Sequence, residues 1–452
     1  MSKVGIFKPK ALCADKVEVE PCTVEEALGH PDWQLAVQAE FDALLVPGCY
    51  FKETFSLVVK PATIRTILSV AVTKGWHLPQ VDVNNAFLNG DLTDDVFMQQ
   101  PPSYEQFGPN GERLVCRLTK ALYGLRQAPR AWFDKLKQFL IFARFTVSKS
   151  DASLFVRSSS DHIIYVLVYM DDIVITGSSV DKINCFVQML HNQFALKDMG
   201  ELHYFLRIEV SQSSSGSLHL CQRKYIRELL ARSSMTNAKS VHTLMITYSL
   251  LSKDEGEPLA DPTDYRSIVG ALQYIILTRP DIAYAVNRSD RLSLVRYTGA
   301  NWGLDFDDRR STTGYFVYYG DNPISWCSKK QQVVSRSTAE AEYRSLAATT
   351  SDVTWLVSLL TELKLSSVDL STVWCDNSSV VAVTANPVLH SKFKHVELDL
   401  FFVREKVASG ELVVGEVPVC DQVEDILTKP LSASMFTQFC HLLRVLPLEE
   451  VR

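Results

Sequence analysis

The segment 162–177, HIIYVLVYMDDIVITG, constrains the fold more than any other part of this 452-residue chain. Its two runs of β-branched and aromatic residues, 162–169 and 173–175, favour paired strands, with Asp171 and Asp172 at or beside a tight turn. Adjacent carboxylates repel one another unless a cation lies between them, and Mg²⁺ prefers oxygen ligands. The segment therefore predicts either a solvated hairpin turn or one part of a divalent metal site.

Length and composition predict a soluble protein of two or three domains. Hydrophobic residues make up 46% of the chain and charged residues 22%, so each domain can bury a core. The ten cysteines form no C-x-x-C pair and no Cys/His cluster, which favours reduced thiols and argues against a zinc site. Because we find no signal-peptide core and no apolar run long enough for a bilayer, we expect a cytoplasmic or nuclear protein without membrane contact.

Several motifs together resemble the polymerase end of copia-type (Pseudoviridae) retrotransposon polyproteins. Tyr169-Met170-Asp171-Asp172 in an apolar hairpin is typical of reverse transcriptases, and the segments described below follow in the order of that family. The resemblance covers nearly the whole chain. It implies an α/β (α+β) fold that combines a reverse-transcriptase palm with an antiparallel sheet and helices, a helical thumb and connection, and a ribonuclease H-like mixed-sheet domain. It also implies that Tyr169 and Met170 contact substrate.

The resemblance implies a first carboxylate at Asp82, in the segment LPQVDVNNAFLNG, paired in space with Asp171. With Asp172 in support, these residues would hold two Mg²⁺ while a primer 3′-OH attacks a deoxynucleoside triphosphate. Phe87 matches the bulky residue that excludes a ribose 2′-OH. The implied partners are an RNA or DNA template-primer and deoxynucleoside triphosphates, and the oligomeric state stays open.

Residues 120–140, KALYGLRQAPRAWFDKLKQFL, resemble the template and nucleotide contact motif of the family. Gly124 would allow close backbone approach, Arg126 and Arg130 can pair with phosphates, and Tyr123 or Trp132 can pack. The residues by themselves predict an amphipathic helix after a proline-containing loop. Its expected core positions are Trp132, Phe133, Leu136 and Leu140. Both interpretations can hold at once.

Two of the departures from the family before the nuclease-like region bear on polymerisation and on strand packing. In the family, several dozen residues with basic fingers strands separate an N-terminal helix pair from the ETFSLVVKP segment, whereas here residues 46–51 join them directly. A triphosphate needs several positive partners, so we expect this deletion to impair polymerisation. Arg207 stands where the family generally has Gly, which predicts disturbed strand packing. Within the helix pair, Thr23 and Glu26 form a capping-box pattern.

The order of motifs predicts five parts. Residues 1–50 would form an N-terminal arm and helix pair, and residues 51–245 a palm and thumb with the fingers largely deleted. Residues 246–292 would form a helical connection. A ribonuclease H-like domain is expected at 293–435, followed by a C-terminal tail at 436–452.

A second set of carboxylates lies in the nuclease-like region. Glu342, Asp376 and Asp425 match three of the four acidic residues with which ribonuclease H holds two Mg²⁺. Without the resemblance, Glu342 is an ordinary helical residue and Asp425 a charge in the first turn of a helix. Ser337 and Glu340 form a capping-box pattern, which predicts a structural role for Glu340.

The fourth nuclease carboxylate is missing from the sequence. The strand of the family reads roughly Y-S-D-A-D-W where this chain has YTGANW at 297–302, so Gly299 replaces the metal-bridging Asp. Neither Gly299 nor Asn301 can supply a bridging anion, and we expect cleavage of RNA–DNA hybrids to be abolished or very weak. His395, in FKHVELD, is a candidate for product release or proton shuttling.

Two functions follow from these residues. The first is an RNA-directed DNA polymerase with an attached ribonuclease H domain, impaired in this copy. The alternative is a degenerate, catalytically inactive retrotransposon-derived protein that at most binds nucleic acid. A net charge of −6 is unfavourable for phosphate contact overall, so binding would depend on local basic segments such as the predicted helix 222–232. A purely structural domain without polymerase ancestry would require the ordered motifs to arise by chance.

Overall fold

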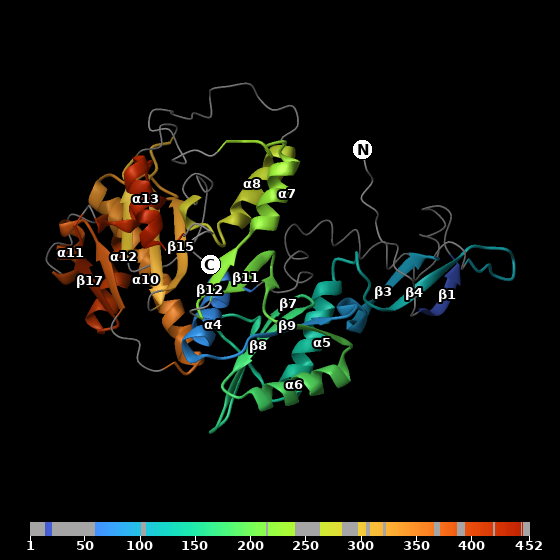
Figure 1. Cartoon of the computed structure of the whole chain (residues 1–452). Helices are drawn as coiled ribbons and strands as arrows, with labels where there is room; N and C mark the ends of the chain where they lie inside the picture. Colours follow the sequence, from blue (N-terminus) through green and yellow to red (C-terminus); the bar gives the residue numbers. More distant parts are fainter. Residues whose placement is uncertain are drawn as a thin grey trace. The chain divides into compact units, whose positions relative to one another are not determined.

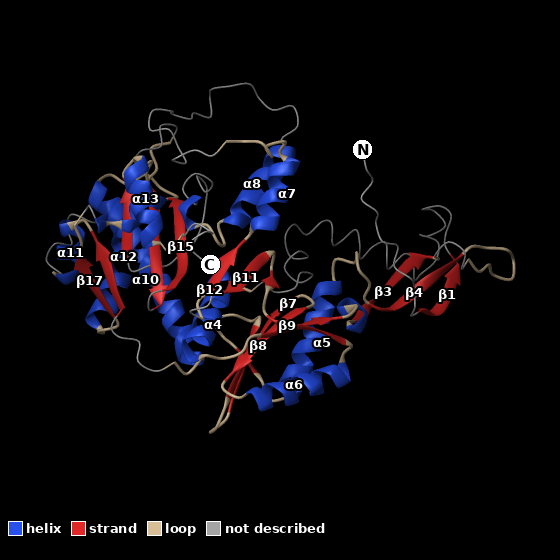
Figure 2. Ribbon diagram, in the orientation of Figure 1, coloured by secondary structure: helices blue, strands red, loops and turns tan. Residues whose placement is uncertain are grey.

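A six-stranded antiparallel sheet carries the hairpin that the sequence predicts (Figures 1 and 2). Its strands, in spatial order, are β5 (Thr146–Val147), β6 (Leu154–Ser158), β7 (Ile163–Tyr169), β8 (Asp172–Gly177), β2 (Pro79–Val83) and β9 (Leu196–Glu201). Strands β7 and β8 pair from Ile164 with Gly177 to Tyr169 with Asp172, which leaves Met170 and Asp171 as the turn. The expected strand, turn, strand arrangement is therefore confirmed.

Helices α5 (Ala128–Phe142) and α6 (Val180–Gln193) pack on this sheet. Alternate residues of β7, such as Val166 and Val168, share one core with apolar residues of both helices, as the two-residue period of a strand requires. Helix α5 begins at a proline-containing turn and buries the side chains at its apolar spacing. The core positions predicted for α5 are all buried, at Trp132, Phe133, Leu136 and Leu140.

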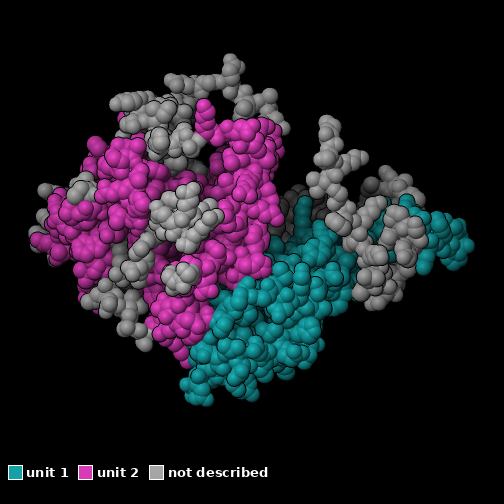
Figure 3. All heavy atoms as spheres, in the orientation of Figure 1, with its two compact units in different colours: residues 1–59, 77–148, 152–201 teal, residues 60–76, 149–151, 202–452 magenta. Residues whose placement is uncertain are grey.

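The computed structural model divides into two compact units, shown in Figure 3. Unit 1 comprises residues 1–59, 77–148 and 152–201, and unit 2 comprises residues 60–76, 149–151 and 202–452. The residues that the structure describes are 14–19, 59–100, 105–213, 216–239, 263–282, 297–303, 308–319, 322–365, 371–386, 394–418, 421–443 and 445. The predictions for Thr23, Glu26 and residues 46–51 lie outside these ranges.

Unit 1 also holds a three-stranded antiparallel sheet in the order β1-β4-β3. Its strands are β1 (Ala14–Val19), β4 (Leu114–Lys120) and β3 (Asp91–Gln99). A short 3₁₀ segment, η1 (Ala86–Asn89), leads from β2 toward β3 and packs against α5. A Cβ atom at Gly90, directly after η1, would lie 2.9 Å from the backbone nitrogen of Trp132, so this approach to α5 requires glycine.

A mixed five-stranded sheet forms the centre of the nuclease-like part of unit 2. The strand order is β15 (Asn322–Lys330), β14 (Thr312–Tyr319), β13 (Tyr297–Asn301), β16 (Ser371–Cys375) and β17 (Leu412–Glu416). The first three strands pair antiparallel, and β16 and β17 are parallel to β13. Helix α10 (Thr338–Glu362) packs on β13 and β14, with α11 (Ser378–Ala385) and α12 (Glu397–Ala408) beside it. The expected mixed sheet is present.

The rest of unit 2 is mostly helical. Helix α4 (Pro61–Lys74) packs against β15, where the Arg65 guanidinium lies 3.7 Å from the centre of the Trp326 ring. Helix α7 (Arg223–Arg232), which matches the predicted basic helix, packs with α8 (Thr263–Ile275). The unit also contains η2 (Pro280–Ile282), η4 (Lys394–Val396), η6 (Val423–Leu427) and α13 (Ala433–Leu442). The predicted boundary after residue 435 falls inside α13.

A small antiparallel sheet in unit 2 contains the Arg207 position. It consists of β10 (Tyr204–Phe205), β11 (Ile208–Gln212) and β12 (Leu218–Cys221). Phe205 pairs with Ile208, so Leu206 and Arg207 form a two-residue turn in which their φ angles are 53° and 55°. Such turns favour glycine because both central residues adopt positive φ. The strands pair although Arg207 stands where the family generally has Gly. The effect of this difference is backbone strain in the turn.

None of the helices in the described ranges combines the length and apolar character that crossing a membrane requires.

Candidate functional site

Three carboxylates meet at one end of the six-stranded sheet of unit 1. Asp171 lies in the turn between β7 and β8, and Asp172 is the first residue of β8. Strand β2 pairs with β8 so that Asp82 lies directly opposite Asp172. The backbone N–H of Val83 donates a 3.0 Å hydrogen bond to the carbonyl oxygen of Asp171. The structure therefore brings Asp82 from a distant part of the sequence to the hairpin turn.

The charges of these carboxylates act on one another. Burial raises the pKa of Asp82, the charge of Asp171 raises it further, and the neighbouring Lys197 opposes both effects. Burial also raises the pKa of Asp172, while Gln80 Nε2 donates a 3.1 Å hydrogen bond to Asp172 Oδ1 and lowers it. Grouped carboxylates with raised pKa values are electrostatically unfavourable, and a divalent cation bound by their oxygens would offset the repulsion.

An aromatic pair lies beside the carboxylates. The ring centres of Phe87, on η1, and Tyr123 are 4.3 Å apart. Tyr123 forms a hydrogen bond with Asp171, and burial, followed by the charges of Asp171 and Asp82, raises the pKa of Tyr123. Sequence reasoning gave Tyr123 only a packing role. Its place directly before Gly124, in the predicted contact motif, is the signal that could have identified it.

The hairpin turn is supported from the core. Met170 has a φ of 54°, which is an unfavourable region for a residue with a side chain. Trp132, fully buried on α5, donates a 2.7 Å hydrogen bond from Nε1 to the carbonyl oxygen of Met170. Sequence reasoning assigned Trp132 to the core, which is correct, but did not predict this second contact.

The predicted phosphate-contact residues occupy different surroundings. Gly124 has a φ of +102°, and because no described residue beyond its chain neighbours has an atom within 4 Å of a Cβ placed there, the backbone conformation alone requires glycine. The Arg126 side chain is exposed. Arg130 Nε lies 2.9 Å from Asp134 Oδ2, an ion pair within α5. Phosphate binding by Arg126 and Arg130 stays a prediction.

The predicted nuclease carboxylates gather at one end of the mixed sheet in unit 2. Ligand atoms of Glu342, Asp376 and Cys375 all lie within 4.8 Å of one another. Asp425, on η6, pairs with Lys429 at 2.6 Å. Burial raises the pKa of Glu342 to about 8, with smaller contributions from the charges of Asp376 and Asp425. The three acidic residues named from the sequence therefore share one electrostatic environment.

Sequence reasoning missed a further carboxylate at this site, that of Glu424. Glu424 is 2% exposed, and its carboxylate lies where a side chain on Gly299 would begin. Thr428 Oγ1 donates a 3.1 Å hydrogen bond to Glu424 Oε2. The sequence gave no local signal, because Glu424 directly precedes Asp425 and is 125 residues away from Gly299.

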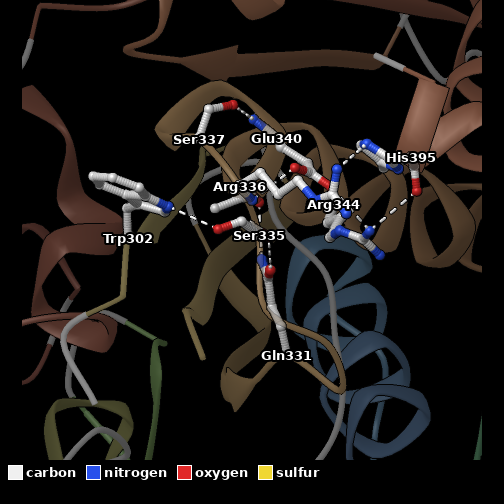
Figure 4. Close-up of polar contacts among 9 residues, drawn as sticks. Trp302, Gln331, Ser335, Arg336, Ser337, Glu340, Arg344 and His395 are labelled. Carbon is white, nitrogen blue, oxygen red and sulfur yellow. Dashed lines mark hydrogen bonds and ion pairs between the residues drawn. The ribbon is translucent and has the colours of Figure 1, made fainter. Parts of the chain in front are cut away.

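The start of α10 is held by a polar network (Figure 4). Ser337 Oγ accepts a 3.2 Å hydrogen bond from the backbone N–H of Glu340, which confirms the predicted cap. The Glu340 carboxylate accepts from the backbone N–H of Arg336 at 2.7 Å and pairs with Arg344 at 3.2 Å. His395 Nε2 lies 2.8 Å from an Arg336 guanidinium nitrogen. Glu340 is thus structural, whereas a role for His395 in product release or proton transfer stays a prediction.

The carboxylate cluster of the nuclease-like part suits a hard divalent cation. Its ligand atoms are mainly carboxylate oxygens, which Mg²⁺ prefers. Glu342 Oε2 is buried and has no hydrogen-bond partner among the described residues. An unpaired buried carboxylate oxygen is costly, and a bound cation would remove that cost. The residues of the nuclease cluster therefore fit a divalent cation, whereas metal binding by Asp82, Asp171 and Asp172 stays a prediction.

Comparison with known proteins gives consistent matches. The family model described as "Reverse transcriptase (RNA-dependent DNA polymerase)" matches residues 38–247. The "Retrovirus-related Pol polyprotein from transposon RE1" of Arabidopsis thaliana is 47% identical over 429 residues, covering 87% of this chain and 29% of that protein. The corresponding polyprotein from transposon TNT 1-94 of Nicotiana tabacum is 34% identical over 434 residues, covering 86% of this chain and 32% of the relative. The chain thus spans less than a third of the length of either relative.

One solved structure in the comparison is that of the foamy viral protease-reverse transcriptase in complex with dsDNA. It is 13% identical, with a TM-score of 0.19, over 75% of this chain and 68% of that chain.

Proposed function

The chain belongs to the reverse transcriptase and ribonuclease H region of copia-type retrotransposon Pol polyproteins, and from this we propose that it catalyses template-directed DNA synthesis. The substrates would be an RNA or DNA template-primer and deoxynucleoside triphosphates. Asp82 and Asp171 would hold two Mg²⁺, with Asp172 in support. Bound Mg²⁺ would activate the primer 3′-OH and stabilise the charge that develops on the phosphates.

The observation that carries this proposal is the pairing of β2 with β8. It places Asp82 opposite Asp172, beside the turn that holds Asp171. A hairpin turn without function would not require a third carboxylate from a segment about ninety residues away, and the mutual repulsion would be a cost without a benefit. Tyr123 restrains Asp171 through its hydrogen bond, and Gln80 restrains Asp172.

The aromatic pair supports a sugar site next to the carboxylates. Phe87 is held by Tyr123, whose hydroxyl bonds to Asp171, so its ring lies near the atoms that would bind metal. In this position a bulky ring would exclude a ribose 2′-OH and favour deoxynucleotides. Arg126, which is exposed, would contact phosphate.

A second candidate function is supported by two other observations. Residues 46–51 stand where the family has its basic fingers strands, and Gly299 stands where the family has a metal-bridging Asp. Under this alternative, the chain is a catalytically inactive retrotransposon-derived protein that at most binds nucleic acid. Even under the first proposal, we expect this copy to be slow in polymerisation and weak in hybrid cleavage.

Primer extension distinguishes the two candidates. We expect the full chain, with Mg²⁺ and a labelled primer-template, to extend the primer, and Asp171→Asn to abolish extension. Asp161→Asn, in the exposed turn between β6 and β7, is the matched control and should keep full activity. If the folded wild-type chain extends no primer under any template condition, the inactive alternative holds.

A further inference from the structure

We propose that Glu424 is a metal ligand of the nuclease site, and that its carboxylate supplies the oxygen ligands that an acidic side chain at residue 299 would otherwise provide. This inference rests on the nuclease part of the proposed function. It adds a residue that the family pattern does not assign, and it explains how the site could bind divalent metal although Gly299 has no side chain.

Two glycines create the space that Glu424 fills. Gly299 on β13 and Gly314 on β14 are direct register partners in the antiparallel pair. A Cβ atom on Gly299 would overlap Glu424 Oε1, and a Cβ atom on Gly314 would lie 2.6 Å from Glu424 Oε2. The Glu424 carboxylate therefore lies over both glycines, and it reaches the position next to residue 299 from η6 instead of from β13.

The Glu424 carboxylate lies close enough to the three predicted ligands for their charges to act on it. The charges of Asp425, Glu342 and Asp376 all act on Glu424, and Lys429 acts in the opposite sense. Lys429 pairs with Asp425 at 2.6 Å and offsets one negative charge. If all four carboxylates are ionised, a net negative charge remains, which a divalent cation would neutralise.

An independent observation supports cation binding at this point. Glu342 is 5% exposed, and its Oε2 atom has no hydrogen-bond partner among the described residues. A carboxylate oxygen of Glu342 and one of Asp376 lie within 4.8 Å of each other. A buried carboxylate oxygen without a donor is unfavourable, so the arrangement is explained if a cation binds there.

A packing role alone does not explain Glu424. Among the residues that the structure describes, its carboxylate has neighbours of like charge and one neutral donor, Thr428 Oγ1 at 3.1 Å. A methionine or leucine would fill the space over Gly299 and Gly314 without burying a charge. A carboxylate at this place is therefore better explained by metal binding than by core packing.

Mn²⁺ binding by the full chain tests the proposal. The parent protein carries Asp171→Asn, so that calorimetric titration with Mn²⁺ reports mainly on the nuclease site. We expect Glu424→Gln, which keeps the shape and removes the charge, to weaken Mn²⁺ binding about tenfold or more. Gly299→Asp alone should not strengthen binding, because its side chain would overlap Glu424. The double variant Gly299→Asp/Glu424→Ala should restore binding to at least the parent level.

Controls separate ligand loss from unfolding. Asp352→Asn, which removes a partly buried carboxyl elsewhere in unit 2, should leave Mn²⁺ affinity unchanged. Thermal unfolding should show that Glu424→Gln without metal is at least as stable as the parent, because glutamine keeps the shape and avoids the cost of burying an ionisable carboxyl among like charges. Unchanged Mn²⁺ affinity in Glu424→Gln, or no binding by the parent, would overturn the proposal. Failure of the proposed polymerase function would appear separately, as a lack of primer extension by the wild-type chain, which carries neither substitution.

Discussion

Trp132 Nε1 donates a 2.7 Å hydrogen bond to the carbonyl oxygen of Met170, so a core helix directly supports the turn that carries Asp171. Met170 has a φ of 54°, and a residue with a side chain keeps such a conformation only when its surroundings enforce it. The indole provides one such restraint from a fully buried position. The position of Asp171 relative to Asp82 therefore depends on a side chain in the core beneath the turn.

Trp132→Phe tests this dependence. Phenylalanine keeps an aromatic ring in the core but loses the hydrogen bond and leaves a small cavity, so we expect a loss of about 1–3 kcal/mol in the free energy of unfolding. Primer extension, measured where both proteins are fully folded, should also slow. Phe133→Leu is the control, because Phe133 is buried in the same core and packs against Phe155 instead of the turn. Equal effects of the two variants on extension would show that the hydrogen bond has no functional role.

Asp171→Asn should change the response of stability to Mg²⁺. Without metal, the variant should be more stable than the wild type by on the order of 1 kcal/mol, because one of three mutually repelling charges is gone. Saturating Mg²⁺ stabilises a protein that binds it only when folded, by about 2.7 kcal/mol at a concentration one hundred times the dissociation constant. Thermal unfolding with and without Mg²⁺ should show a smaller rise for the variant than for the wild type. An identical rise would mean that Asp171 does not bind metal.

The hairpin and its core could be predicted because the relevant signals are local. The continuous apolar runs in 162–177 predict two buried strands, and the apolar spacing in α5 predicts Trp132 and Leu136 in the core. The turn at Met170 and Asp171 follows from the break between two strand-forming runs. Each of these inferences uses residues less than twenty positions apart.

The parts that could not be predicted depend on contacts between distant segments. Nothing near Trp132 indicates that its indole reaches Met170, because the contact follows from how α5 packs on the sheet. The sequence near Gly299 does not show that a carboxylate lies next to this residue, because that carboxylate belongs to Glu424 on η6. The resemblance to a family predicted that Asp82 lies near Asp171. It could not predict the position of Glu424, because the family pattern does not assign this residue.

Arg207→Gly should stabilise the protein. Leu206 and Arg207 both have positive φ in the turn between β10 and β11, and such a conformation costs a residue with a side chain about 1–2 kcal/mol. Part of this gain is offset because glycine is more flexible in the unfolded chain and because the contact of Arg207 with the Tyr225 ring, at 5.3 Å, is lost. We expect a net gain of about 0.5 kcal/mol in urea unfolding. Arg207→Ala, which loses the ring contact without relieving the strain, should be no more stable than wild type, and a gain there would contradict this explanation.

Asp352 should make the stability of unit 2 depend on pH. Burial raises the pKa of Asp352 to about 6, although Tyr315, Lys60 and Lys329 act to lower it. In the unfolded chain an Asp has a pKa of about 3.9, so between these values the folded state binds a proton that the unfolded state does not. The stabilisation that comes from proton binding by Asp352 in the folded state is complete below about pH 4. It is lost as the pH rises through about 6.

Asp352→Asn removes this titration and keeps an acceptor for the Tyr315 hydroxyl, which donates to Asp352 Oδ2 at 3.3 Å. Relative to the variant, the wild type should lose on the order of 1 kcal/mol between pH 4 and pH 7, a modest value because the side chain is only partly buried. Urea unfolding of both proteins at steps of pH, under metal-free conditions, measures this difference directly. A difference that stays constant across the range, or that grows in favour of the wild type as the pH rises, would mean that the Asp352 carboxyl is ionised in the folded protein throughout.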